Sequence, residues 1–293
     1  MDCGKYSFIK ALRPFSFSVA LIACGLGVLA AGLDGFSDPL RAALVILAGV
    51  LAQATVNLIN DHSDKSLWRE RVDVSDQERS AVLALISRNT RIGVLCGVVA
   101  GLIGLWLTLK TDLGLLALCV VGFLGGYYYT AEPINYKRRG LGVALVFWFT
   151  GVLLVLGAYY ALTSTISVQA LLLSLPIALL SSLLLLSNEL RDVEADRQHG
   201  LKTLTVRIGA NPARGLYLAL LGSNYLLCGY LWQQGLLAKL YGLVPSLLFA
   251  LWLIRVLMLP GGGGERLPPL TGRYFMLFGV GYLFTVYAVE LVS

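Results

Sequence analysis

The sequence predicts an all-α integral membrane protein with nine spanning helices. Of its 293 residues, 57% are hydrophobic and only 14% are charged, whereas a soluble domain carries about 25% charged residues. The apolar residues form long continuous runs and do not alternate with polar ones, which indicates spanning helices and not the strands of a barrel. The lysines and arginines also fall mainly on one side of the nine-helix topology, as expected for a membrane protein.

Nine runs are long and apolar enough to be spans, at about 20 residues for each crossing. They are residues 15–33, 40–60, 92–109, 113–130, 141–161, 168–187, 213–232, 239–258 and 273–292. The first run is too long for a signal peptide and no small-residue cleavage site follows it, so we interpret it as a retained span. The largest connection, residues 61–91, contains a predicted helix from Ser75 to Arg88. No soluble domain is left over, and we expect residues 1–293 to form a single transmembrane domain.

The distribution of basic residues predicts the orientation in the membrane. The nine-span topology places 20 of the 23 lysines and arginines on one side, which is therefore expected to be cytoplasmic. The N-terminus then lies inside and the C-terminus outside, in the inner (plasma) membrane of a bacterium or archaeon. The residues that test this orientation are His62, Arg138 and Lys202 inside, and Asp34, Thr163 and Ser293 outside. Membrane lipid is an expected partner of the basic surface, nucleic acid is not, and no motif predicts an oligomeric state.

Two acidic stretches end apolar runs on the predicted cytoplasmic side. The first is residues 57–64 and the second is residues 188–209. Residues four apart share one face of a helix, which aligns the acidic and amide side chains within each stretch. Because charged groups are costly against lipid, we expect both faces to line a water-filled cavity and to hold something charged. If the two faces meet, they form an oxygen-only site suited to Mg²⁺ that bridges to a phosphate. A zinc site is excluded, since only two histidines and no C-x-x-C pair are present.

The two stretches resemble the motifs of the UbiA superfamily of membrane prenyltransferases. The first is similar to the family's N-D-x-x-D motif, at Asn60, Asp61 and Asp64. The second is similar to its D-x-x-x-D motif, at Asp192 and Asp196, and continues as G-x-x-T through residues 200–203. Residues 129–142, with Y-T-x-x-P and a later G-L-G, and an R-P pair at residues 13–14 extend the resemblance over nearly the whole chain. The motifs are nearest to those of the 1,4-dihydroxy-2-naphthoate polyprenyltransferases of menaquinone biosynthesis.

The resemblance implies nine transmembrane helices around a central cavity and a Mg²⁺-dependent transfer of a polyprenyl group from an isoprenyl diphosphate to an aromatic acceptor. The expected catalytic residues are Asp61, Asp64, Asp192 and Asp196, and the expected metal ligands are Asn60, Asp64, Asp192 and Asp196. The expected substrate-binding residues are Asn57, Asn60, Tyr129, Lys137, Arg138, Arg139, Asn188, Arg191, Arg197 and Lys202. The basic members of this set would stabilise the leaving diphosphate.

The sequence departs from the family pattern at several positions. Trp68 stands where many members have an aspartate, and Asp73 is the nearest substitute. Glu189 stands where an asparagine is common, Val143 replaces an acid after G-L-G, and Pro133 interrupts a Y-x-x-x-K element. These departures leave the acceptor open between 1,4-dihydroxy-2-naphthoate, which the motifs favour, and 4-hydroxybenzoate or another aromatic or lipid-quinone precursor.

Rival functions of other classes fit the motifs less well. The acids of a cation transporter would more typically lie at mid-membrane, whereas these lie at helix ends beside basic loops. A CDP-alcohol phosphotransferase would also use aspartates and Mg²⁺, but its D-G-x-x-A-R signature is missing.

Overall fold

The computed structural model describes residues 3–70, 74–259 and 263–289, so Asp73 and Ser293 lie outside the described residues. Within these ranges the chain is helical and contains no strand. The longer helices are α2 (Phe17–Leu33), α3 (Pro39–Asn60), α5 (Asp76–Lys110), α6 (Leu113–Tyr127), α8 (Leu154–Thr163), α9 (Val168–Gln198), α11 (Ala210–Gln233), α12 (Val244–Leu257) and α13 (Leu267–Tyr287). The short helices are η1 (Cys3–Tyr6), α1 (Phe8–Leu12), η2 (Pro14–Ser16), η3 (Asp61–Ser63), α4 (Asp64–Glu70), α7 (Gly142–Val146), the π-helical η4 (Phe147–Leu153), α10 (Leu204–Ile208), η5 (Leu240–Leu243) and η6 (Gly264–Arg266).

Each apolar run of the sequence falls on one of the longer helices, with α7, η4 and α8 together covering the run 141–161. Six segments of the described chain are long and apolar enough to cross a membrane: Phe8–Leu33, Pro39–Glu70, Asp76–Lys110, Gly142–Thr163, Val168–Gln198 and Leu240–Leu257. The apolar helix α6 is shorter than these six. The all-α membrane fold is therefore confirmed, while the count of nine spans stays a prediction.

The helix predicted from Ser75 is the first part of α5. The Ser75 hydroxyl accepts a hydrogen bond from the backbone N–H of Glu78 at 3.1 Å, which caps the helix. This helix then continues without interruption into the predicted third span and ends at Lys110. The connection between the second and third runs is thus mostly helical.

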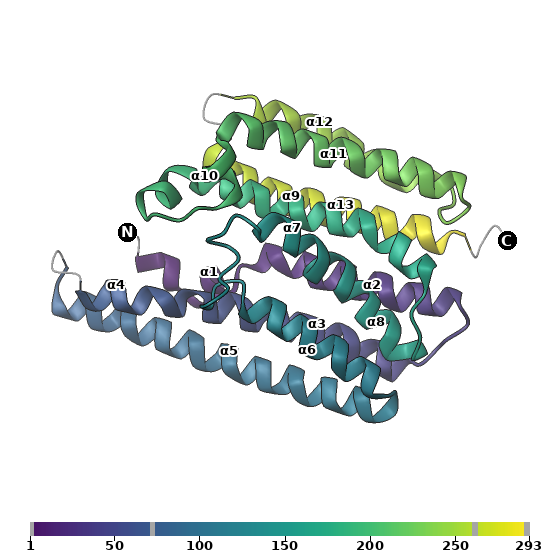
Figure 1. Ribbon diagram of the computed structural model, residues 1–293, viewed down its shortest axis with the longest axis horizontal. Helices are drawn as coiled ribbons and strands as arrows, with labels where there is room; N and C mark the ends of the chain where they lie inside the picture. The colour runs from purple at the N-terminus through teal and green to yellow at the C-terminus, as the bar shows by residue number, and fades with distance from the viewer. Residues whose placement is uncertain (1–2, 71–73, 260–262, 290–293) are drawn as a thin grey trace.

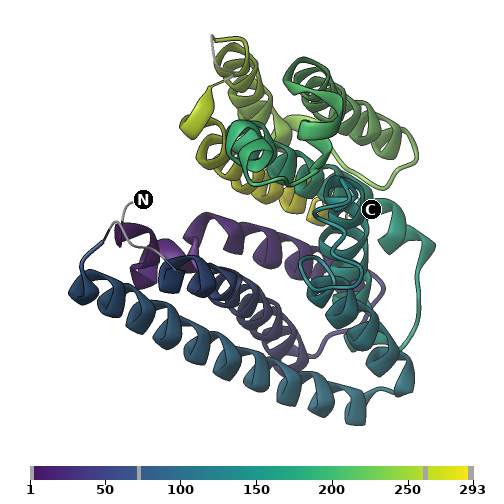
Figure 2. The ribbon, with the colours of Figure 1, turned by 60° about the vertical axis from the view of Figure 1, so that its left-hand side comes forward.

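The longer helices run side by side along one direction (Figure 1). Helix α9 lies at the centre, in contact with α2, α11, α13 and η4, whereas α5 packs mainly on α3. Figure 2 shows α11–α13, in green to yellow, on one side of the bundle and α2, α3 and α5, in purple to blue, on the other. In the most apolar stretch of α9, 72% of the residues are buried inside the protein, whereas in that of α5 the share is 17%. Helix α9 is therefore the core helix, and α5 is peripheral.

Close contact between α9 and the π-helical segment depends on a glycine. A Cβ atom at Gly151 would collide with the backbone of Ala178 on α9. Small residues at such crossings let membrane helices approach closely, where packing drives helix association. This contact holds the π-helical segment against the amino-terminal half of α9.

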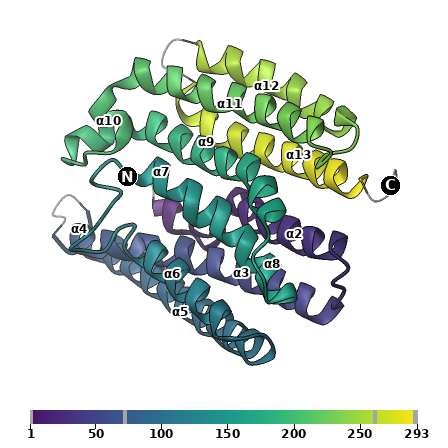
Figure 3. The same cartoon turned by 45° about the vertical axis from the view of Figure 1, so that its right-hand side comes forward.

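The two acidic stretches lie at the same end of the bundle. Helices α1, α4 and α10, which flank the ends of α3 and α9, gather at the end that also holds the N-terminus in Figures 1 and 3. The end of α13, the last described helix, lies at the opposite end. This arrangement agrees with the nine-span topology, which requires both stretches on one side of the membrane.

Candidate active site

The first acidic stretch is a turn between α3 and α4. Helix α3 ends at Asn60, a 3₁₀ turn follows from Asp61, and α4 begins at Asp64. Asp61 is only 3% exposed, and its Oδ1 accepts from Arg13 Nη2 at 3.3 Å. The side-chain amide of Asn60 is oriented with its oxygen toward the Arg13 guanidinium, and this oxygen accepts a hydrogen bond from Arg13 Nη2 at 2.8 Å. Arg13 therefore bridges the first two residues of the N-D-x-x-D motif.

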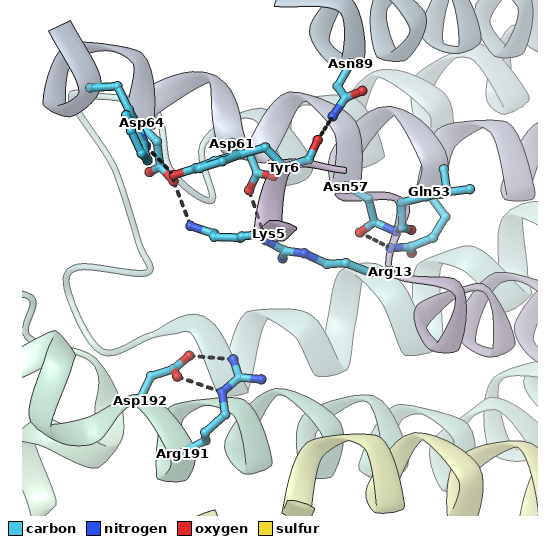
Figure 4. A network of polar contacts seen from close by, with 12 residues as sticks. Lys5, Tyr6, Arg13, Gln53, Asn57, Asp61, Asp64, Asn89, Arg191 and Asp192 are labelled. Carbon is cyan, nitrogen blue, oxygen red and sulfur yellow. Dashed lines mark hydrogen bonds and ion pairs between the residues drawn. The ribbon is translucent and has the colours of Figure 1, made fainter. Parts of the chain in front are cut away.

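Asp64 is bound by two residues of the N-terminal segment. Its Oδ2 accepts from Lys5 Nζ at 2.7 Å and from the Tyr6 hydroxyl at 2.9 Å (Figure 4). The Tyr6 oxygen in turn accepts from the indole Nε1 of Trp68 at 2.9 Å. Burial alone would lower the pKa of Lys5, but the hydrogen bond and the charge of Asp64 raise that pKa above its ordinary value.

Asn57 anchors the same N-terminal segment. Its Nδ2 donates to the Leu12 carbonyl at 2.8 Å and to Ser16 Oγ at 2.7 Å, while its Oδ1 accepts from Gln53 at 3.1 Å. These bonds flank Arg13, whose φ of 50° is a left-handed conformation that is costly for a side chain with a Cβ. Asn57 thus holds the turn that presents Arg13 to Asp61, a structural role that the motif did not indicate.

The second acidic stretch is the exposed end of α9. Arg191 and Asp192 form a bidentate pair, with Nε and Nη2 each 2.7 Å from a carboxylate oxygen. Asp196 accepts from the Thr203 hydroxyl at 3.2 Å. Gly200 makes this return contact possible, because its φ of 68° lets the chain turn back after α9 ends. The G-x-x-T element is therefore the turn that ties the second motif to the chain that follows it.

The other predicted residues of α9 and the segment after it make local contacts. The amide of Asn188 donates to the Leu184 carbonyl of its own helix at 2.9 Å. Arg197 pairs with Glu194 at 2.9 and 3.0 Å on the exposed surface, and the side chain of Lys202 is exposed as well. The exposed side chains of Arg197 and Lys202 can contact a ligand dissolved in water, whereas the Asn188 amide is hydrogen-bonded within its own helix.

Glu189 fixes α10 onto α9. It is 4% exposed, and its Oε2 accepts the backbone N–H of Thr205 at 3.0 Å. Its Oε1 and the Thr205 hydroxyl are both buried and have no hydrogen-bond partner of normal geometry among the described residues. The departure from asparagine at this position therefore places a carboxylate where it holds the segment after the second motif.

The loop of residues 128–141 lies beside the second motif. The rings of Tyr129 and Tyr136 are 5.3 Å apart, and Lys137 Nζ lies 6.0 Å from the centre of the Tyr129 ring. Burial raises the pKa of the Asp196 carboxyl, and the nearby charge of Lys137 partly offsets this rise. A Cβ at Gly140 would lie 2.6 Å from Arg207 Cδ, which shows how closely the loop packs on the chain after α9.

The Tyr136 side chain of this loop is a neutral phenol at ordinary pH. Burial raises the pKa of Tyr136 to about 12. Arg138 pairs with Glu132 at 3.8 Å and Arg139 donates to the Pro133 carbonyl at 2.7 Å, and both guanidinium groups are exposed. Of the three basic residues at 137–139, Lys137 is thus the one turned toward the second motif.

The chemistry of the acidic groups fits a hard divalent cation. The described residues include no group of three His, Cys, Asp or Glu side chains close enough together to hold a metal ion. Carboxylate and amide oxygens are nevertheless the ligands that Mg²⁺ takes. Asp61, Asp64 and Asp192 each bind a cationic side chain of the protein itself. The four-ligand shell of Asn60, Asp64, Asp192 and Asp196 stays a prediction.

Four contributors to the first motif were not predicted. Lys5 entered the sequence argument only as one of the basic residues on the cytoplasmic side, and Arg13 entered it as a basic residue and as part of the R-P pair. Tyr6 and Trp68 had no assigned role. The R-P pair at residues 13–14 is the one signal that could have identified Arg13. Lys5 and Tyr6 lie 59 and 58 residues before Asp64, so no local pattern links them to it.

Comparison with known proteins agrees with these motifs. The family model described as "UbiA prenyltransferase family" matches residues 20–261. The chain is 30% identical over 244 residues to the 1,4-dihydroxy-2-naphthoate octaprenyltransferase of Escherichia coli (strain K12), covering 80% of this chain and 79% of that protein. It is 30% identical over 284 residues to UbiA prenyltransferase domain-containing protein 1 of Rattus norvegicus, covering 96% and 83%.

Solved structures share the fold. A UbiA homologue from Archaeoglobus fulgidus bound to GPP and Mg²⁺ superposes with a TM-score of 0.65 at 16% identity, covering 96% of this chain and 98% of that one. A structure of digeranylgeranylglyceryl phosphate synthase superposes with a TM-score of 0.60 at 15% identity, covering 98% and 99%. The backbone arrangement described above therefore recurs in proteins of very different sequence.

Proposed function

The chain belongs to the UbiA prenyltransferase family, and we propose that it transfers a polyprenyl group from an isoprenyl diphosphate to an aromatic acceptor with the help of Mg²⁺. The observation that carries this proposal is the placement of both acidic motifs at one end of an apolar helical bundle. Such a site keeps the diphosphate in water while the prenyl tail stays among apolar helices. We further propose that residues 1–293 act as one transferase domain.

The residues of the site have separable roles in the proposed reaction. Asp64, Asp192 and Asp196 would hold Mg²⁺ with Asn60, and the ion, when bound, would supply positive charge to the leaving diphosphate. Asp61 would orient the turn through its contact with Arg13. The C–O bond to the diphosphate breaks, and its electron pair leaves with the diphosphate. An electron-rich carbon of the acceptor ring bonds to the prenyl carbon, and that ring carbon then loses its carboxylate as carbon dioxide, or its proton, which restores the aromatic ring. The apolar helices exclude water, which would otherwise quench the cation.

Basic side chains of this chain would bind the diphosphate directly. Lys137 and Arg191 lie beside the second motif, and Arg197 and Lys202 are exposed at the same end. Positive groups placed where negative charge develops lower the barrier to its formation. Arg138 and Arg139 contact residues of their own loop and the Asn188 amide bonds within its own helix, whereas Lys137 is turned toward the second motif, so we rank these three below Lys137 as diphosphate ligands.

We propose 1,4-dihydroxy-2-naphthoate as the acceptor, with loss of carbon dioxide, in menaquinone biosynthesis. The motif sequences around residues 57, 129 and 197 and the Escherichia coli relative support this choice. A 4-hydroxybenzoate acceptor would use the same diphosphate site. We also propose that the motif end of the bundle faces the cytoplasm of a prokaryotic cell, with the N-terminus inside and the C-terminus outside.

The test is a transfer assay with purified protein, Mg²⁺, a long prenyl diphosphate and a panel of acceptors. We expect a prenylated naphthoate product and no product after chelation of the metal. Transfer to 4-hydroxybenzoate alone would overturn the acceptor and keep the reaction class. Uptake of an ion into sealed vesicles, without release of diphosphate, would overturn the transferase proposal itself.

A further inference from the structure

We infer that Tyr6 is a positioning residue for Asp64, held in place by Trp68 and Asn89. The inference rests on the proposed function, because Asp64 matters here as a metal ligand. It assigns a role to the N-terminal segment and to the tryptophan that stands where many family members have an aspartate.

Tyr6 is fixed by hydrogen bonds at both ends. It is 0% exposed, and its hydroxyl donates to Asp64 Oδ2 at 2.9 Å while accepting from Trp68 Nε1 at 2.9 Å. The Tyr6 backbone carbonyl accepts from Asn89 Nδ2 at 3.0 Å. Since the indole can only donate, the Tyr6 hydroxyl is directed to donate to Asp64. The three partners come from α4 and α5, so the contacts join the N-terminal segment to the helices after the first motif.

Trp68 cannot serve as a metal ligand, and its surroundings explain its presence. It is 1% exposed and packs edge-to-face on Tyr6, with ring centres 5.9 Å apart. Tyr6 and Trp68 form a small separate core with Val82 and Ile86 of α5. A carboxylate at position 68 would be buried in this apolar cluster. The indole fills the space and directs its N–H at the phenol, as buried tryptophans usually do with a polar partner.

The geometry at Asp64 leaves one carboxylate oxygen for a ligand. Both hydrogen bonds that the described residues give to Asp64, from Lys5 and from Tyr6, end on Oδ2. The Lys5 side chain is 45% exposed and can move away, whereas Tyr6 is enclosed. Tyr6 therefore fixes the rotation of the carboxylate whether or not Lys5 stays. Partners that orient a metal ligand in this way typically change metal affinity by about 10–100-fold when removed.

Tyr6 and Trp68 could instead form only a structural core, with their polar ends satisfied. The two roles differ in what the hydroxyl does. Tyr6→Phe keeps the ring in the core and removes the hydroxyl, and with it the bond to Asp64 and the bond from Trp68 Nε1. Tyr282→Phe is the matched control, because Tyr282 is also 0% exposed and its hydroxyl donates to the Leu173 carbonyl at 2.9 Å, away from both motifs.

The experiment measures binding of Mn²⁺ with inorganic diphosphate to the purified protein by electron paramagnetic resonance, together with the melting temperature. We expect Tyr6→Phe to weaken Mn²⁺ binding by about tenfold or more, and Tyr282→Phe to leave it unchanged. Wild-type binding in Tyr6→Phe, with binding lost in Asp64→Ala, would overturn the inference and keep the proposed site. Wild-type binding in Asp64→Ala would overturn the metal site of the proposed function.

A second variant covers the case in which Tyr6→Phe fails to fold. Trp68→Phe keeps a smaller aromatic ring in the core and removes the N–H that directs the Tyr6 hydroxyl. We expect weaker Mn²⁺ binding in this variant, by a smaller factor than in Tyr6→Phe. Unchanged Mn²⁺ binding in a folded Trp68→Phe protein would overturn the role of the indole. It would also overturn the inference that Trp68 and Tyr6 together position Asp64.

Discussion

The two acidic motifs lie at the same end of the bundle, but they are built in different ways. In the first, Asp61 is buried, with a side chain 4% exposed, and its cationic partner Arg13 lies 48 residues away in sequence. In the second, Asp192 has a side chain 42% exposed and its partner Arg191 is the preceding residue. The first motif therefore depends on tertiary packing of the N-terminal segment, and the second is carried by one long helix.

This difference indicates that the two motifs have different roles at the site. A buried acid with distant partners has a fixed position, because several elements must move before it can move. An exposed acid with a neighbouring partner can exchange that partner for a ligand at little cost, since exposed ion pairs contribute about 0–1 kcal/mol. We expect the first motif to set the geometry of the metal site and the second to adjust to the incoming diphosphate.

The largest expected effects come from removing one acid of each motif. Asp64→Ala and Asp192→Ala should each lower the rate of prenyl transfer by about 10²–10³-fold, the usual cost of losing one group that stabilises developing charge. Asp196→Ala should behave in the same way. The measurement is product formation at saturating prenyl diphosphate, with folding checked by the melting temperature.

Equal losses in the two motifs would support a single shared site. Chelation of Mg²⁺ in the wild-type protein should lower the rate as far as the alanine variants do. Full activity in Asp192→Ala and Asp196→Ala, with loss only in Asp64→Ala, would show that the second motif does not hold the metal.

The next prediction concerns the free energy of unfolding, in which the two motifs should differ most clearly. Arg13→Ala leaves the buried carboxylate of Asp61 without its cation and should lower the free energy of unfolding by about 3 kcal/mol. This is the lower end of the cost of breaking a buried pair, because the Arg13 side chain is itself 37% exposed. Arg191→Ala, at the exposed pair, should cost at most about 1 kcal/mol. Denaturation in detergent measures both, and equal losses would contradict the comparison.

Glu189 is an exception within the second region, because it is buried while its neighbours are exposed. Glu189→Ala leaves the backbone N–H of Thr205 without an acceptor and should lower the free energy of unfolding by about 1–2 kcal/mol. Glu189→Gln keeps an oxygen for that N–H and serves as the matched control, with a smaller loss. Similar stability of both variants and the wild type would show that α10 is held by other contacts.

The helices and the second motif could be predicted from the sequence because their determinants are local. Each apolar run became a helix, and the alignment of Asp192 and Asp196 follows from the regular spacing of one uninterrupted helix. The turn at Gly200 is also local, since only a glycine adopts its positive φ without cost. In the first motif the same spacing argument was less useful, because α3 ends at Asn60 and a 3₁₀ turn separates it from Asp64.

The N-terminal segment could not be predicted because its contacts depend on the packing of the whole bundle. Lys5 and Tyr6 reach Asp64 only after α1, α3 and α5 have come together. Trp68 was recognised as a missing acid, yet its bond to Tyr6 joins residues 62 apart. The count of basic residues placed this segment on the cytoplasmic side and gave its basic residues no role at the site, whereas Lys5 and Arg13 bind the first motif.

The smallest expected effect on stability belongs to Arg197, and it tests whether the exposed motif is the adaptable one. Among the residues that the structure describes, Arg197 pairs with Glu194, three residues before it, and both side chains are more than half exposed. Arg197→Ala should therefore change the free energy of unfolding by less than about 0.5 kcal/mol. If Arg197 binds the diphosphate, the same variant should raise the KM for the prenyl diphosphate several-fold without changing the KM for the acceptor. Glu194→Ala is the matched control, because it breaks the same pair and keeps the guanidinium, so it should leave both KM values unchanged. An unchanged KM for the prenyl diphosphate in Arg197→Ala would show that Arg197 does not bind this substrate. Lys137 and Arg191 would then remain as the cations of the second motif.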